Sequence, residues 1–278
     1  MNVKFLKRFM RRKSSVIGGI IIIIFIFMAI VGPYLCTQNP LKIDVRNKYQ
    51  NPSREHWLGT DNLGRDTFTR LVYGARITLL VSFVSVFVGT IVGLILGVIA
   101  GYFGGNVDTL IMRVTDILLA FPGLLLAIAI VAILGSGIVN TMIAIAFYSI
   151  PYITRIVRAS VISIRELEYI QACEVIGCSN FEIIFYHIIP NSMSQVIVNT
   201  TLRLGTAILT SSSLSFLGLG VQPPNPEWGA MLSKAREAMQ STPIAALAPG
   251  IAITLVVISF SMLGDGLRDA LDPKLKNV

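Results

Sequence analysis

Long apolar runs recur along the chain, and polar stretches separate them. A transmembrane helix needs about 20 mostly apolar residues, and six runs of this kind can be recognised. They cover residues 16–35, 76–101, 109–134, 138–157, 192–220 and 245–264. The fold class predicted by the pattern is an all-α membrane protein with six transmembrane helices.

The basic N-terminus predicts the orientation. Six Lys or Arg and no acid lie within the first thirteen residues, and a basic flank marks the cytoplasmic side of a first helix. A cleaved signal peptide usually has a shorter apolar region of about 7–15 residues, so an uncleaved first helix and cytoplasmic termini are expected. The outer loop expected at residues 36–75 is itself basic, against the usual charge bias. The orientation therefore depends on the first helix, which usually dominates.

Composition narrows the classes of function. Hydrophobic residues make up 54% of the chain and charged residues only 14%, against about 25% charged in an ordinary globular domain. The net charge of +8 does not predict nucleic-acid binding, because much of the excess lies at the N-terminus. Cys36, Cys173 and Cys178 form no C-x-x-C pair, so no metal site is expected. The chain also lacks a G-x-x-x-x-G-K-[ST] phosphate loop, so neither an enzyme nor a bound cofactor is predicted.

Glycine recurs every four residues in the second span, at Gly89, Gly93, Gly97 and Gly101. Such a stripe lets another helix approach closely inside a membrane. The second span is therefore predicted to be a scaffold helix.

Charges and prolines give local predictions for the third and fourth spans. Arg113 and Asp116 are three residues apart and are expected to pair on one helix face. Pro122 and Pro151 are expected to bend the helices that contain them.

The fifth span is the least apolar, and its polar residues follow steps of three and four. Those steps place them on one helix face. The residues are Ser192, Gln195, Asn199, Arg203, Thr206, Thr210 and Ser213. Hydroxyls and amides can simply join helices, but a charge at the bilayer centre costs roughly 2.5–3.5 kcal/mol on insertion scales. We therefore favour a path for a polar solute from Asn199 to Ser213, in which Arg203 attracts a carboxylate.

Residues 158–191 are polar and regularly patterned. One apolar face consists of Leu167, Ile170, Cys173 and Ile176, and a second consists of Phe181, Ile184, Phe185 and Ile188. Gly177 is a typical helix end, and residues 179–182 fit the capping box S-x-x-E. Pro190 is expected to close the second helix. The pattern predicts a cytoplasmic helical hairpin.

Acidic residues favour a protein partner for this hairpin. Helices that lie on membranes are usually rich in Lys and Arg, whereas this segment carries Glu166, Glu168, Glu174 and Glu182. A docking element is therefore preferred over a membrane-surface helix.

The hairpin resembles the cytoplasmic EAA loop of bacterial ABC-importer permeases. That pattern is E-A-A, three residues, Gly, nine residues and Ile-x-Leu-Pro. Ala172, Gly177 and Pro190 match it at the family spacing. Gln171, Cys173, His187 and Ile189 depart from it.

Three further stretches are similar to one subgroup of this family. They are HWLGTDNLGRD at residues 56–66, LSFLGLGVQPPNPEWGAML at 214–232 and LGDGLRDALDP at 263–273. The subgroup is the second permease subunit of dipeptide, oligopeptide, glutathione and nickel importers. The resemblance implies a type I ABC-importer permease fold with an N-terminal segment 1–73, a transmembrane domain 74–264, a coupling loop 158–191 within it, and a cytoplasmic tail 265–278.

The resemblance also implies partners in the bacterial cytoplasmic membrane. They are a homologous second permease, two ATPases that hold ATP and magnesium, and an external solute-binding protein. The implied ATPase-coupling residues are Glu168, Gln171, Ala172, Gly177, Phe181, Phe185 and Pro190. The outer loops, with Trp57 and Trp228, would face the binding protein, although tryptophans can also serve as interfacial anchors.

Short peptides are the implied cargo. DILLAFPGLLLAIAIVAILGSGI and LRLGTAI are most similar to glutathione-type members, and a nickel chelate is an alternative. A secondary transporter working alone would usually show an internal repeat and ion-binding acids at mid-membrane, and the sequence shows neither. A membrane enzyme would need a catalytic site, for which the sequence offers no candidate. A scaffold subunit without a path of its own stays open, and it predicts that Arg203→Leu leaves transport intact, whereas a path predicts loss.

Overall fold

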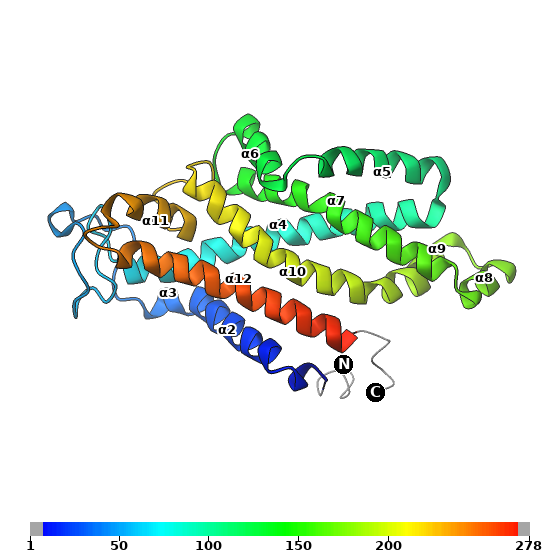
Figure 1. The fold of residues 1–278 in the computed structure, drawn as a ribbon, viewed down its shortest axis with the longest axis horizontal. Helices are drawn as coiled ribbons and strands as arrows, with labels where there is room; N and C mark the ends of the chain where they lie inside the picture. The colour runs from blue at the N-terminus through cyan, green and yellow to red at the C-terminus, as the bar shows by residue number, and fades with distance from the viewer. Residues whose placement is uncertain (1–7, 272–278) are drawn as a thin grey trace.

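Long helices lie side by side along the longest axis of the molecule (Figure 1). The structure, a computed structural model, describes residues 8–271. The long helices are α2 (Lys13–Ile30), α4 (Thr67–Phe103), α7 (Ile138–Arg165), α10 (Ile189–Phe216) and α12 (Ile244–Leu271). The shorter helices are α3 (Gly32–Leu35), η1 (Val45–Asn47), α5 (Gly105–Leu119), α6 (Gly123–Leu134), α8 (Glu168–Val175), α9 (Asn180–Glu182), η2 (Ile183–Ile188), α11 (Trp228–Ala235) and η3 (Arg236–Ala238). Lys4, Lys7 and residues 272–278 of the predicted tail lie outside the described residues.

Within the described residues, four helices are long and apolar enough to cross a membrane. They are α2, α4, α7 and α12, and the bent pair of α5 and α6 would make a fifth. An all-helical membrane protein is thereby confirmed. α10 has 28 residues but falls below the hydropathy of the other long helices. The fifth predicted span, at residues 192–220, therefore stays a prediction, and with it the total of six.

The third predicted span is not one continuous helix. α5 ends at Leu119, α6 begins at Gly123, and their axes differ by 90°. Pro122 precedes α6, and its missing N–H and fixed ring prevent α5 from continuing. Gly123 lies so close to α7 that an added Cβ would be 2.7 Å from the Tyr148 ring. Pro151, by contrast, lies inside an unbroken α7.

Two helical segments lie where the sequence predicted loops. α4 begins at Thr67, so residues 67–75 are helical and not part of an outer loop. Asp66 caps this start, because its side chain accepts a bond from the Thr69 N–H at 2.7 Å. α11 was also not predicted, and Glu227 caps it in the same way by accepting from the Ala230 N–H at 2.8 Å. Asp is a preferred N-cap residue, and the negative charge of either acid is stabilising at a helix N-terminus.

The glycine stripe of α4 packs against α7, as predicted. All four glycines are buried. An added Cβ at Gly97 would lie 2.6 Å from the Val157 Cβ, and one at Gly93 would lie 2.7 Å from the Ile153 Cβ. The two helices therefore approach more closely than any larger residue would allow.

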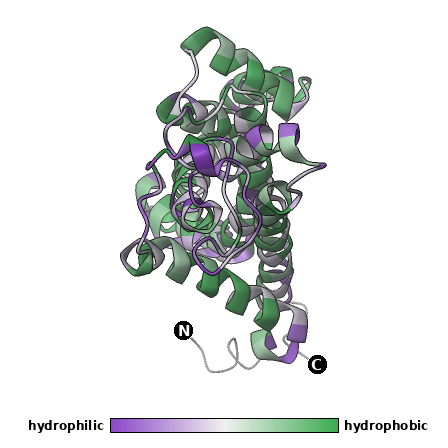
Figure 2. Ribbon diagram, turned by 90° about the vertical axis from the view of Figure 1, so that its left-hand side faces the viewer, coloured by the Kyte–Doolittle hydropathy of each residue, from purple (hydrophilic) through white to green (hydrophobic). Residues whose placement is uncertain are grey.

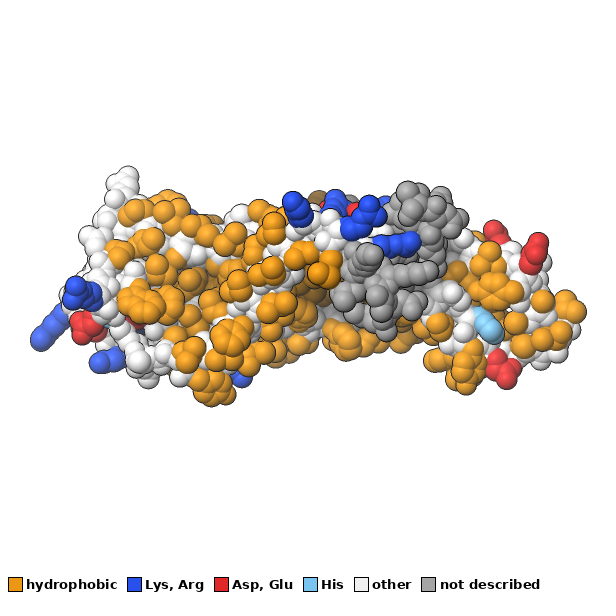
Figure 3. All heavy atoms as spheres, turned by 90° about the horizontal axis from the view of Figure 1, so that it is seen from below, with side chains coloured by type: hydrophobic (Ala, Val, Ile, Leu, Met, Phe, Trp, Pro, Cys, Tyr) orange, Lys and Arg blue, Asp and Glu red, His pale blue; other side chains and the backbone are white. Residues whose placement is uncertain are grey.

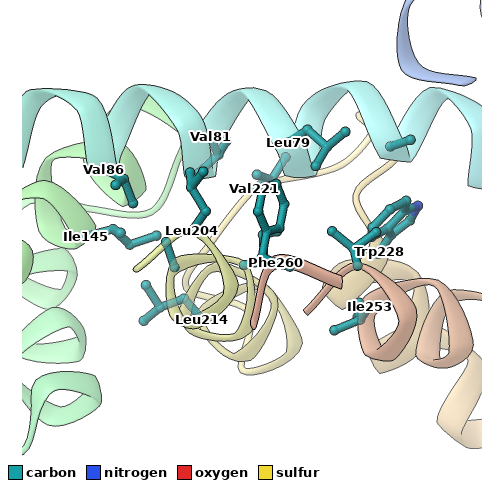
Figure 4. Packing of buried hydrophobic residues seen from close by; sticks show 14 of the residues in the cluster. Leu79, Val81, Val86, Ile145, Leu204, Leu214, Val221, Trp228, Ile253 and Phe260 are labelled. Atoms are coloured by element: carbon teal, nitrogen blue, oxygen red, sulfur yellow. The ribbon is translucent and has the colours of Figure 1, made fainter. Parts of the chain in front are cut away.

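The hydrophobic core lies where α4, α10, α11 and α12 meet (Figure 4). Leu79 from α4, Leu214 from α10 and Phe260 from α12 are all buried there. Seen end-on, polar residues gather in the loops, while the helices are mainly hydrophobic (Figure 2). In the view from below, hydrophobic side chains cover most of the face, and charged side chains gather at its two ends and along one edge (Figure 3). This distribution suits a bilayer around the middle of the bundle.

The α4–α7 contact gives a test of the fold. We expect Gly97→Ala to lower the free energy of unfolding by about 1–3 kcal/mol, because the added methyl group overpacks a helix contact. Thermal unfolding of the purified chain in detergent would measure this. Gly19→Ala in α2 is the matched control, since its new Cβ would meet only Leu263 Cδ1 at 3.8 Å. An unchanged Tm for Gly97→Ala would contradict the close approach.

Candidate functional site

The predicted hairpin is present, and its two helices are α8 and α9. Ser179 and Glu182 form the predicted capping box. The Glu182 side chain accepts from the Ser179 N–H at 2.8 Å, and the Ser179 hydroxyl accepts from the Glu182 N–H at 3.3 Å. The Ser179 backbone, followed by its hydroxyl, lowers the pKa of Glu182 below its usual value. The start of the second helix is therefore fixed by local chemistry.

Gly177 ends the first hairpin helix, as predicted. Its φ is +86°, a left-handed conformation that glycine adopts without penalty. The space around its missing side chain is open, because nothing lies within 4 Å of a Cβ placed there. Conformation and not crowding therefore requires glycine at this turn.

Pro190 does not close the second helix, contrary to the prediction. The chain is helical from Asn180 through Phe216, and Pro190 lies in the first turn of α10. The preceding η2 is a π-helix in which the Ile189 N–H donates to the Ile184 C=O, five residues back. A wider turn relaxes the clash that a proline ring makes with a carbonyl four residues back. The hairpin and α10 are thereby joined without a break.

The hairpin buries only part of each predicted apolar face, and it also buries Ile183, which was not predicted to lie on either face. Ile170, Ile183 and Ile188 are fully buried. Of the predicted faces, Leu167, Ile176, Phe181 and Phe185 are instead exposed. The second predicted face is changed by the π-helix η2, because the 3.6-residue period used for the prediction does not hold through a π-helix.

The exposed side of the hairpin is largely apolar. We call it the hairpin surface, and it consists of Val175, Ile176, Phe181, Phe185 and Tyr186. Val175 is 86% and Ile176 is 77% exposed, and the rings of Phe181 and Phe185 stack with centroids 4.3 Å apart. An exposed apolar cluster on a polar segment is typical of an interaction site.

The predicted coupling residues lie around the hairpin surface. Glu168, Gln171, Ala172, Gly177, Phe181, Phe185 and Pro190 are all exposed. The Gln171 side chain bonds weakly to the Glu166 C=O at 3.4 Å. The structure therefore leaves all seven accessible to a partner.

A contact that the sequence did not reveal joins the hairpin to α4. The Tyr102 hydroxyl donates to the Asn180 side-chain oxygen at 2.8 Å. The Arg165 guanidinium lies over the Tyr102 ring, 5.6 Å from its centroid. The end of α4, the end of α7 and the start of α9 thus meet at one tyrosine.

The predicted Arg113–Asp116 pair is wrong. Asp116 instead forms an ion pair with Arg155 of α7, and Asp108 forms one with Arg158. α5 lies beside α7 (Figure 1), so these arginines reach its acids across the helix contact. Two tertiary ion pairs thereby hold α5 on α7.

Arg203 lies at the middle of α10 and stacks on tyrosines of α7. Its guanidinium is 3.6 Å from the Tyr152 ring centroid and 6.0 Å from that of Tyr148. Within residues 8–271 it forms no ion pair with an acid. A cation over an aromatic face is stabilised by up to about 2 kcal/mol when water is excluded. Arg203 is therefore held in place by aromatic rings, which compensate its charge only in part.

The other stripe residues bond within α10 itself. Thr206 donates to the Arg203 C=O and Thr210 to the Thr206 C=O, both at 2.9 Å. Asn199 donates to the Gln195 C=O at 2.8 Å. Thr206 is exposed, while Asn199, Thr210 and Ser213 are half-buried. Among the described residues, these threonine hydroxyls bond to no helix other than α10, and their face of α10 is accessible. Ser192, further along the stripe, is buried.

Trp228 does not face outward, contrary to one prediction. It is fully buried, its indole N–H donates to the Leu71 C=O at 2.9 Å, and its ring meets Phe25 edge-on at 5.6 Å. The preceding Glu227 is also fully buried and accepts from the Thr78 hydroxyl at 3.3 Å. Burial raises the pKa of Glu227 above its usual value, against these hydrogen bonds. Trp57 is 66% exposed, so its outward role stays a prediction.

Residues 93–277 match the family model of the binding-protein-dependent transport system inner membrane component. The chain belongs to this family. Residues 3–52 of the permease also match the N-terminal transmembrane domain of oligopeptide transport permease C. The predicted ABC-importer permease of the bacterial inner membrane is thereby confirmed, with ATP hydrolysis assigned to partner subunits.

The permease is similar to curated relatives over nearly its whole length. It is 53% identical to the dipeptide transport system permease protein DppC of Alkalihalophilus pseudofirmus, over 98% of this chain and 89% of the relative. It is 47% identical to the glutathione transport system permease protein GsiD of Pectobacterium atrosepticum, over 99% of this chain and 91% of the relative.

Solved transporters share the fold of the permease. The inward-facing MetNI methionine ABC transporter matches with a TM-score of 0.58 at 18% identity, over 73% of this chain and 97% of that chain. An amino acid ABC transporter crystallised with histidines matches with a TM-score of 0.56 at 15% identity, over 72% and 94%. At these identities the likeness shows the ABC-importer permease fold alone.

The Arg203–Tyr152 contact can be tested by stability. We expect Tyr152→Leu to lower the free energy of unfolding by about 1–2 kcal/mol, because the cation loses its aromatic face. Tyr152→Phe keeps that face and should change little. Combining Tyr152→Leu with Arg203→Met should cost less than the two single losses added together. Thermal unfolding in detergent measures all four variants, and strictly additive losses would exclude the contact.

Proposed function

We propose that this chain forms one half of the translocation path of an ATP-driven importer of short peptides, glutathione included. Its relatives named above are a dipeptide and a glutathione permease, each covered almost completely. Peptides and glutathione share free carboxylates, which an unpaired guanidinium attracts. The observation that carries the proposal is the position of Arg203 at the middle of an accessible polar helix face, where it forms an ion pair with no acid among residues 8–271.

The accessible stripe supports a second permease as partner. Asn199, Arg203, Thr206, Thr210 and Ser213 lie on a face of α10 that no helix of this chain covers completely. Polar groups and a charge facing lipid would be costly. A second permease that covers this face would enclose a polar path between the two chains.

The hairpin supports coupling to an ATPase. Its hairpin surface is apolar and exposed, and it is flanked by the exposed Glu168 and Glu174. The helix that starts at Asn180 continues without a break through η2 into α10. A displacement of the hairpin by one of two partner ATPases, each with ATP and magnesium, is therefore passed directly to the stripe. Glu168, Gln171, Ala172, Gly177, Phe181, Phe185 and Pro190 are the proposed coupling residues.

The arrangement of the ends supports the expected orientation. The start of α2, the end of α12 and the hairpin lie toward one end of the bundle, and the loop after α3 and α11 lie at the other (Figure 1). Arg12 and Asp269 form an ion pair near the first end. We propose that the first end is cytoplasmic and that the second faces the solute-binding protein. We keep the proposed division of the chain into an N-terminal segment 1–73, a transmembrane domain 74–264 and a cytoplasmic tail 265–278.

Co-purification tests the assembly. The tagged chain, expressed from its own genomic setting and solubilised gently, should bring down a second permease and two ATPases. The binding protein encoded nearby can then be titrated with dipeptides, glutathione and nickel chelates. Recovery of this chain alone would contradict the coupling role of the hairpin. If the binding protein bound only nickel chelates, the proposed peptide cargo would be wrong.

The path is tested at Arg203. We expect Arg203→Leu to reduce peptide uptake into proteoliposomes at least about tenfold, because a carboxylate loses its charged partner. Arg203→Lys should retain part of the uptake, since the charge is kept. Arg113→Leu is the control, because Arg113 is exposed on α5 and lies outside the stripe. Full uptake by Arg203→Leu in an intact assembly would favour a scaffold subunit.

The turn of the hairpin is tested at Gly177. Gly177→Val should abolish coupling between ATP hydrolysis and uptake, because a β-branched residue is strained at positive φ. Gly177→Asn is the matched control, since asparagine tolerates the left-handed conformation at helix ends. Both activities are measured in the assembled transporter. Equal uptake by the two variants would show that the turn conformation does not matter.

A further inference from the structure

Two cysteines meet at the turn of the hairpin, and the proposed transport mechanism does not use them. α8 ends in a Schellman motif around Gly177. The Cys178 N–H donates to the Cys173 C=O at 3.0 Å, and the Gly177 N–H donates to the Glu174 C=O at 3.2 Å. In this motif the residue after the left-handed glycine contacts the residue five positions before it. Cys178 and Cys173 occupy these two positions.

The two thiols are within reach of each other. A direct backbone hydrogen bond keeps the Cα atoms of its two residues within about 7 Å, which is the limit for a disulfide. Burial raises the pKa of the Cys178 thiol, and the neighbouring Cys173 thiol and then Glu182 raise it further. Both side chains are half-buried and free.

His187 makes the two thiols unequal. Its Nε2 is 3.9 Å from the Cys173 Sγ, and its ring meets Tyr169 edge-on with centroids 6.0 Å apart. An imidazole that accepts the thiol proton raises the share of the reactive thiolate. Cys173 thus lies beside a base, and this contact distinguishes it from Cys178.

We propose that Cys173 and Cys178 form a reversible intrachain disulfide, with a low-molecular-weight disulfide as the oxidant. The Cys173 thiolate, its proton on His187, attacks one sulfur of the oxidant. A mixed disulfide forms, the oxidant's S–S bond breaks, and one small thiolate leaves and takes a proton. The Cys178 thiol then attacks the Cys173 sulfur, the bond between Cys173 and the small molecule breaks, and the proton of Cys178 passes to the second small thiolate as it leaves. Two protein thiols are oxidised, and one small disulfide is reduced to two thiols.

The place of the pair gives the disulfide a defined effect. Disulfides in the reducing cytosol are usually transient or regulatory, and this one would tie the end of α8 to the start of α9 across Gly177. The alternative is a plain apolar contact, since free cysteine also behaves as a small hydrophobic residue. Formation of the disulfide depends only on the two thiols and on their neighbours in the hairpin. The proposal therefore does not rest on the transport function.

The pair is tested in inside-out membrane vesicles that contain the full chain. The vesicles are treated with oxidised glutathione and then alkylated with N-ethylmaleimide, and the peptides are analysed by mass spectrometry. We expect a 173–178 link that lacks two hydrogens and is reversed by dithiothreitol, while Cys36 remains alkylated. Alkylation of both Cys173 and Cys178 after oxidation would overturn the proposal, as would a link between chains only.

Three variants separate the roles of Cys173 as attacking thiol, Cys178 as resolving thiol and His187 as base. In Cys178→Ser the mixed disulfide with glutathione should accumulate on Cys173, whereas Cys173→Ala should prevent the link and leave Cys178 slow to react. Cys173→Ala introduces the alanine of the E-A-A pattern, so the hairpin should still fold. In His187→Gln the link should form about tenfold more slowly at neutral pH and recover at higher pH, because a base no longer assists the thiol. An unchanged rate in His187→Gln would remove the histidine from the proposal.

Discussion

The close contact between α4 and α7 is the constraint on which the remaining structure depends. Four buried glycines let the two backbones approach, and α7 then positions the other elements. Tyr148 and Tyr152 on α7 lie beneath Arg203, while Arg155 and Arg158 hold α5. A wider spacing between α4 and α7 would move the tyrosines and the ion pairs together. The function proposed for α10 thus depends on glycines whose missing side chains would point at α7.

The contrast between the two arginine environments explains how charge is tolerated in this bundle. Arg155 and Arg158 neutralise acids near the end of α7. Arg203 has an aromatic face instead of an acid, and such a contact compensates part of a charge without cancelling it. The guanidinium can therefore still attract an anion, which an ion-paired arginine could not do as strongly.

Helix ends and caps were predictable from the sequence, while contacts between distant segments were not. The Gly177 turn, the capping box at Ser179 and the glycine stripe follow from short-range rules and were predicted correctly. The π-helix at residues 183–188 shifted the buried face of the second hairpin helix, and no residue pattern in the sequence predicts such a wider turn. The partner of Asp116 and the burial of Trp228 depend on distant segments. Periodicity within one helix carries no information about those segments.

The outer end of α4 has a consequence for the order in which the chain assembles. The Thr78 hydroxyl bonds to Glu227 and the Leu71 carbonyl to the Trp228 indole, across separations of 149 and 157 residues. During synthesis the first half of the protein enters the membrane long before these partners exist. A truncated chain that ends before residue 227 would keep an open slot beside Gly74, where the Trp228 ring otherwise lies. The start of α11, with Trp228, therefore fills this slot only after most of the bundle has been made.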